Sequence, residues 1–97
     1  MKTSKEGMSE FERSVAGKVR TFLVHEVLEG DESELEEDTS LIASGIMNSR
    51  TMVKLMAFVD ENYGVTLSFK QLNPGNLQTV RSIAKMIAAS TSNKKQS

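Results

Sequence analysis

Residues 45–52 read Gly-Ile-Met-Asn-Ser-Arg-Thr-Met and mark the point where an irregular segment ends and a helical pattern begins. Asn is common just before a helix, because its side chain accepts a hydrogen bond from a free backbone N–H of the first turn. Asn48 is therefore predicted to cap the helix. The question is why Ser49 follows it. From this dipeptide alone, a second capping hydroxyl and a functional serine both remain open.

The pattern after Ser49 predicts an amphipathic helix. Apolar side chains recur at three- and four-residue steps, which is the spacing of one helix face. Gly64 follows the last of them and is placed to end the helix in the left-handed conformation. The members of this face are Met52, Leu55, Met56, Val59 and Tyr63.

Two further segments show the same spacing. Ser9, with Glu12 three residues later, is a capping-box pattern and predicts a first helix that continues to a stop near Gly30. A last helix is predicted from about Asn76 to Ser90. The apolar faces are Phe11, Val15, Val19, Phe22, Leu23 and Val27 in the first, and Leu77, Val80, Ile83, Ala84 and Ile87 in the last.

The connecting segments are less regular. A short helix is predicted at residues 69–73, where Pro74-Gly75 stops it. The link over residues 29–48 exceeds the two to eight residues usual between bundled helices. Residues 1–8 and 91–97 are polar and aperiodic, so flexible tails are predicted around a domain spanning residues 9–90. The long link is predicted to be pinned across the bundle by Leu35, Leu41, Ile42 and Ile46.

Composition excludes several classes of protein. At 97 residues the chain is predicted to form one domain with a modest core. Twelve Lys and Arg against thirteen Asp and Glu give a net charge of −1, which argues against a general nucleic-acid binder. The chain has no cysteine, and the single His25 has no second histidine to join it, so no metal site is expected. No apolar run could span a membrane, and residues 1–7 lack a signal-peptide core, so the expected compartment is the cytoplasm.

Taken in order, these features resemble the acyl carrier protein family, the small four-helix carriers of fatty-acid, polyketide and peptide synthesis. The resemblance covers about residues 9–89 and implies an all-α, acyl-carrier-like four-helix bundle, with three main helices, a short third helix and a long first loop. The motifs that carry it are Asp38-x-x-Leu41, Gly45, Asn48-Ser49 where the family usually has Asp-Ser, Asp60-Glu61-Asn62-Tyr63-Gly64-Val65, and Thr79-Val80.

The resemblance implies a role for Ser49. In that family a separate phosphopantetheinyl transferase attaches 4′-phosphopantetheine to the Ser that opens helix two. A carrier holds its cargo as a thioester, and because this chain has no cysteine, the thiol must come from such a group. The phosphodiester is an anion that suits the positive dipole end of a helix. Asn48 and Arg50 are expected beside it, and a monomeric carrier served by an acyl or aminoacyl ligase or transferase and a synthase is implied.

Charge near Ser49 departs from the family's usual pattern. Arg50 stands where an apolar residue is usual, and Lys54 lies four residues later on the same helix face. Helix two of fatty-acid carriers is typically acidic. We therefore expect Arg50 and Lys54, together with Met47 and Met52, to contact partners of a specialised pathway rather than the general fatty-acid enzymes.

The sequence does not identify the cargo. Several apolar residues could line a cleft for an acyl chain, but the same residues would be needed to hold the bundle together. They are Ile42, Ile46, Met52, Met56, Leu67, Leu72 and Ile83.

Two other functions remain open. Neither is enzymatic, and catalysis by this chain is not expected, because no Ser–His–acid set in the sequence has a supporting motif. The spacing in Gly-Ile-Met-Asn-Ser is similar to that of D-alanyl carrier proteins, so an aminoacyl carrier is the first alternative. The second is an unmodified helical adaptor that binds a protein through exposed Met47 and Met52 or through the acidic loop. Residues 26–38 include eight acidic side chains and no basic one, which fits a solvated loop or a docking surface for basic partners.

Overall fold

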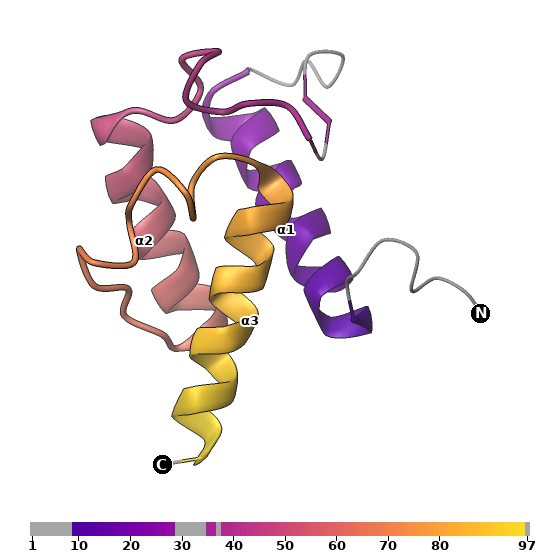
Figure 1. The fold of residues 1–97 in the computed structure, drawn as a ribbon, viewed down its shortest axis with the longest axis vertical. Coiled ribbons are helices and arrows are strands. Elements are labelled where there is room, and N and C mark those ends of the chain that lie inside the picture. Colours follow the sequence, from indigo (N-terminus) through magenta and orange to yellow (C-terminus); the bar gives the residue numbers. More distant parts are fainter. Residues whose placement is uncertain (1–8, 29–34, 37, 97) are drawn as a thin grey trace.

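The computed structural model describes residues 9–28, 35–36 and 38–96, and in these residues the chain forms three α-helices and no strand (Figure 1). The helices are α1 (Glu10–Glu26), α2 (Ser49–Tyr63) and α3 (Val80–Gln96). The prediction of an all-α, acyl-carrier-like bundle is thereby confirmed. The predicted N-terminal tail, residues 1–8, lies outside the described residues.

The three helices are not equally close to one another. Figure 1 shows α1 running antiparallel to α2 and α3, and the backbones of α1 and α3 lie in close contact. Between α1 and α2, side chains form the bridge: the rings of Phe22 and Phe58 stack with centroids 4.8 Å apart. Lys54 Nζ also lies 3.1 Å from Glu26 Oε1. Large side chains hold helices further apart, so the α1–α2 seam is wider than the α1–α3 contact.

The ends of α1 follow from local hydrogen bonds. Ser9 Oγ accepts from the backbone N–H of Glu12 at 3.1 Å, and the Glu12 carboxylate accepts from the N–H of Ser9 at 3.0 Å. This reciprocal pair confirms the predicted capping box. The helix ends at Glu26, and the N–H of Val27 still donates to the carbonyl of Leu23. The predicted stop at Gly30 lies outside the described residues.

The bounds predicted for α2 are confirmed. Asn48 caps its first turn, and Gly64 ends it with φ 66°, in the left-handed region where a residue without Cβ is not strained. The buried face consists of Thr51, Leu55 and Val59. Met52, Met56 and Tyr63, expected on the same face, are half-buried along its edge.

The bounds predicted for α3 are wrong at both ends. The helix begins at Val80 rather than near residue 76, because Thr79 and Ser82 cap it: Thr79 Oγ1 accepts from the N–H of Ser82, and Ser82 Oγ accepts from the N–H of Thr79, both at 3.0 Å. It continues to Gln96, so residues 91–96, predicted as part of a tail, are helical. Thr91 Oγ1 donates to the carbonyl of Ile87 at 2.8 Å within this extension.

The predicted short helix at residues 69–73 is not an α-helix in the structure. The N–H groups of Gln71 and Leu72 donate three residues back, to the carbonyls of Ser68 and Phe69, which makes two successive turns. Pro74 has no N–H to continue such a series, and it disfavours helical geometry at Asn73 before it. Over the described residues, the bundle therefore consists of three helices and a turn-rich connection between α2 and α3.

One core holds the helices and both connections together. The long link contributes Leu35, Leu41 and Ile46, as predicted, whereas Ile42 is 44% exposed and that prediction is wrong. The N–H of Leu41 donates to the carbonyl of Gln78 at 2.7 Å, which ties the link to the residues before α3. Each large apolar side chain buried here stabilises the fold by about 1.5–3 kcal/mol. The fully enclosed ones are Leu23, Leu35, Leu41, Leu55, Leu67, Ile83, Ile87, Val15, Val19, Val59 and Val80.

Candidate functional site

Among the described residues, Asn48 is the one whose side chain caps the first turn of α2. Its Oδ1 accepts from the N–H of Thr51 at 3.0 Å, and its Nδ2 donates to the carbonyl of Gly45 at 3.3 Å. Ser49 is the first helical residue and is exposed. Within the described part of the chain, its hydroxyl has no hydrogen-bond partner. The alternative of a second capping hydroxyl is therefore wrong, and a nucleophilic oxygen is presented to solvent.

A buried threonine fixes the turn behind Ser49. Thr51 is 3% exposed, and its Oγ1 donates to the carbonyl of Ile46 at 2.9 Å. Sequence reasoning missed this residue. The signal was its position four residues before Leu55 and eight before Val59, on the face that is buried. A hydroxyl on such a face needs a partner inside the protein.

The turn itself is anchored by the core. Gly45 adopts φ 85°, which favours a residue without Cβ, and its N–H donates to the carbonyl of Ile42 at 3.1 Å. The N–H of Met47 donates to the carbonyl of Leu41 at 2.8 Å. Ile46 and Met47 are 5% and 6% exposed. Met47 therefore packs in the core, and the expectation that it is exposed for docking is wrong.

The surface beside Ser49 is electropositive at the start of α2. The first turn holds no acidic residue, and Arg50 is exposed there. Lys54, one turn later, forms its ion pair with Glu26 of α1, and both side chains are nearly half exposed. Free N–H groups and the helix dipole add partial positive charge at the same end. The arrangement suits an anion on Ser49.

A model of one protein family matches residues 21–87, and its description is the phosphopantetheine attachment site. The chain belongs to this family. It is a carrier of 4′-phosphopantetheine, and carrier domains of this kind are not themselves catalytic. This agrees with Ser49, which is exposed at a positive helix end and whose hydroxyl has no partner among the described residues. Carriers of this family work with phosphopantetheinyl transferases and with synthases or ligases.

A solved structure shares the fold of this carrier. A chain in a crystal structure described as that of an FAD-dependent dehydrogenase is 33% identical, with a TM-score of 0.67. The match covers 71% of the carrier and 97% of the other chain, so that chain is itself about the size of a carrier domain. A comparison with curated proteins gave no match.

The residues of this carrier fit the prosthetic group. The attachment chemistry needs an accessible hydroxyl, and Ser49 supplies one at the end of an element, where a long arm can move. Asn48 shapes the turn, while Arg50 and the first N–H groups of α2 would face the phosphodiester. When bound, the group supplies the thiol that this chain lacks.

The proposed acyl-cleft residues do not share one environment. Ile46, Leu67 and Ile83 belong to the closed core, and Met52, Met56 and Leu72 are half-buried. Ile42 lies apart at the surface. It lines a hollow of about 340 Å³ with Ser40, Ala43, Pro74, Gly75 and Gln78. The core members could contact a cargo only if the bundle opened.

Two absences hold for the described residues. No helix among them is long and apolar enough to cross a membrane. They also contain no group of three or more His, Cys, Asp or Glu side chains that could hold a metal, and His25 is exposed on α1.

Proposed function

We propose that this carrier holds its cargo as a thioester on 4′-phosphopantetheine attached to Ser49, and that it acts as a separate protein of a specialised pathway in the cytoplasm. The observation that carries the proposal is the exposed hydroxyl of Ser49 beside a capped, acid-free helix start. In the transfer, Ser49 Oγ bonds to the phosphorus that carries the pantetheine arm in coenzyme A. The hydroxyl proton passes to a base of the transferase, and the adenosine bisphosphate leaves.

Coexpression with a broad-specificity phosphopantetheinyl transferase tests the attachment residue. We expect the intact mass to rise by one phosphopantetheine group in the wild type and in Ser44→Ala, which removes a nearby exposed serine. Ser49→Ala should gain nothing while keeping its helical circular dichroism. A mass gain in Ser49→Ala would show that another residue is modified.

The charge around Ser49 supports a dedicated set of partners. Arg50 is exposed immediately after the attachment residue, and Lys54 follows on the same face of α2. An enzyme that recognises carriers through a basic patch would meet like charge here. The complementary partner is a ligase or synthase that has acidic groups at that contact.

The similar solved chain supports one class of partner. A carrier-sized chain within a crystal structure of an FAD-dependent dehydrogenase is what a complex of the two proteins would contain. We therefore propose that a flavin-dependent dehydrogenase acts on the thioester held by this carrier. Either an acyl or an aminoacyl cargo would suit such a reaction. Size-exclusion chromatography of the holo-carrier with such an enzyme tests this: co-elution is expected, and separate elution at high micromolar concentrations would contradict it.

A further inference from the structure

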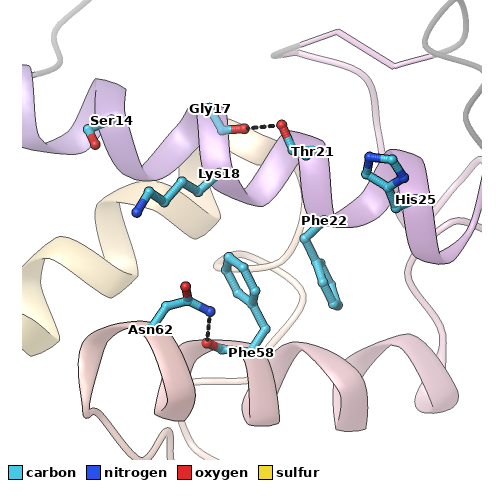
Figure 2. Close-up of a pocket in the computed structure, with 8 residues that line it drawn as sticks. All are labelled: Ser14, Gly17, Lys18, Thr21, Phe22, His25, Phe58 and Asn62. Carbon is cyan, nitrogen blue, oxygen red and sulfur yellow. Dashed lines mark hydrogen bonds between the residues drawn. The ribbon is translucent and has the colours of Figure 1, made fainter.

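Three hollows lie in a row along the seam between α1 and α2, and the side-chain pairs that bridge the two helices form the walls between them; together the hollows are called the groove. The first, of about 390 Å³, begins at Asn48 beside the start of α2. It shares Glu26 and Lys54 with the second, of about 300 Å³. The second shares Phe22 and Phe58 with the third, of about 580 Å³ (Figure 2). The groove thus leads from the residue before Ser49 to the far end of α2.

The chemistry of the groove changes along its length. At the end near Ser49 it is lined by Arg50 and by the ion pair of Lys54 with Glu26. In the middle the stacked rings of Phe22 and Phe58 form an apolar floor. Its far part is also mostly apolar, because Phe22 and Phe58 line it together with side chains that carry hydroxyl, amide and amine groups (Figure 2). These far residues include Ser14, Lys18, Thr21 and Asn62.

We propose that the phosphopantetheine arm attached to Ser49 rests in this groove. The inference depends on the proposed attachment to Ser49 and concerns where the arm lies between reactions. The phosphodiester matches Arg50 at the near end, where Lys54 is paired with Glu26. The two methyl groups of the pantoyl unit match the Phe22 and Phe58 rings, and polar side chains of the far part, such as Thr21 and Asn62, can hydrogen-bond to the amides of the arm.

A tethered ligand needs only weak contacts to occupy such a groove. Covalent attachment makes the encounter intramolecular, with an effective concentration in the millimolar range for short flexible tethers. The far part of the groove also has free space. A Cβ placed on Gly17, which lines the far part, would meet no atom within 4 Å. By contrast, Leu67 and Ile83 of the alternative cleft are at most 2% exposed, so a cargo there would have to displace core packing.

The thiol of the arm provides a direct test, because the chain has no cysteine of its own. Lys18→Cys places a second thiol in the groove of the holo-protein. Oxidised glutathione then converts the two thiols into one intramolecular disulfide and releases two reduced glutathione molecules. The equilibrium constant gives the effective concentration of the arm at that position. Asn62→Cys, on the opposite wall, gives a second reading in case Lys18→Cys does not fold.

Asp60→Cys is the matched control. Asp60 lies about three helical turns after Ser49 and on the same face of α2, so an arm without a preferred site reaches it at least as easily as it reaches Lys18. Met56→Cys reports on the alternative cleft. We expect an effective concentration at Lys18→Cys or Asn62→Cys roughly tenfold or more above that at Asp60→Cys and Met56→Cys.

The outcomes separate this inference from the proposed function. Intact mass, measured before oxidation, shows whether Ser49 has been loaded, and a failure to load contradicts the attachment proposal. If the arm is loaded but Asp60→Cys or Met56→Cys equals or exceeds both groove variants, the carrier role stands and the groove inference is wrong. Protein NMR of unmodified and holo wild type gives an independent readout, in which the amides of Thr21 and Asn62 should shift more than that of Asp60.

Discussion

Thr51 Oγ1 donates a hydrogen bond of 2.9 Å to the carbonyl of Ile46, and this buried contact ties the first turn of α2 to the turn before it. The same hydroxyl lies 3.3 Å from Oδ1 of Asn48, the capping residue. The Thr51 side chain therefore supports both the turn at Ile46 and the cap at Asn48, which directly precede Ser49. The position of the Ser49 hydroxyl depends on a residue that solvent does not reach.

Thr51→Val should destabilise the fold by about 1–3 kcal/mol, because the carbonyl of Ile46 would stay buried without its donor. Thr51→Ser keeps the hydroxyl and should lose about 1 kcal/mol, the value of the missing methyl group. Urea unfolding followed by circular dichroism measures both variants. We also expect slower phosphopantetheinylation of Thr51→Val than of Thr51→Ser. Equal rates would show that the transferase does not depend on this turn.

Asn48→Ala should lose about 1 kcal/mol of stability, because it removes the side chain that caps the first turn of α2. Ser49→Ala should change stability by less than about 0.5 kcal/mol, since its exposed hydroxyl bonds to no described residue. Urea midpoints of the two variants test this contrast. A larger loss of stability in Ser49→Ala than in Asn48→Ala would show that Ser49, rather than Asn48, caps the helix.

Sequence patterns predicted the ends of elements well wherever one side chain decides them. Ser9 and Glu12, Asn48, and Gly64 each act through a local hydrogen bond or a backbone preference that neighbouring residues do not alter. The predicted start of α3 was wrong. Periodicity placed it near Asn76, whereas the reciprocal cap of Thr79 and Ser82 makes the helix begin at Val80. A cap of this kind fixes where the helix begins, even when apolar residues at helical spacing also precede it.

Tertiary contacts account for the features that the sequence did not predict. Met47 is buried because its N–H is paired with the carbonyl of Leu41, which turns its side chain into the core. The hydroxyl of Thr51 finds its partner at Ile46, outside its own helix. The ion pair of Lys54 with Glu26 joins residues far apart in the chain. Periodicity assigns a residue to a face of a helix but does not give what lies against that face.

Tyr63 should make stability fall at high pH. Burial raises the pKa of its hydroxyl, which has no hydrogen-bond partner in the described part of the chain. A raised pKa means that the folded state holds its proton where the unfolded state, with a pKa near 10, has begun to lose it. The stabilising contribution is thus complete below pH 10 and is lost as the pH rises toward the folded pKa.

Tyr63→Phe tests this directly. Its stability at pH 7 should be unchanged or higher by up to about 1 kcal/mol, because it removes a polar group that is buried and unpaired. The edge-to-face contacts with Phe11 and Phe58 do not require the hydroxyl. Urea midpoints between pH 8 and 11 should fall less in Tyr63→Phe than in the wild type. Parallel curves would mean that Tyr63 does not cause the pH dependence.

Arg50→Glu should improve acyl transfer from a fatty-acid malonyltransferase that docks through a basic patch. The substitution replaces like charge with opposite charge immediately after Ser49, the proposed attachment residue, which we expect to raise the rate several-fold at low salt. Arg50 is the sharper target, since Lys54 is partly neutralised by Glu26. Lys70→Glu makes the same change of net charge on an exposed residue of the α2–α3 connection and serves as the control. The difference between the two variants should shrink at high salt, where exposed charges are screened. If Lys70→Glu raises the rate as much as Arg50→Glu, net charge rather than the position of Arg50 governs the encounter.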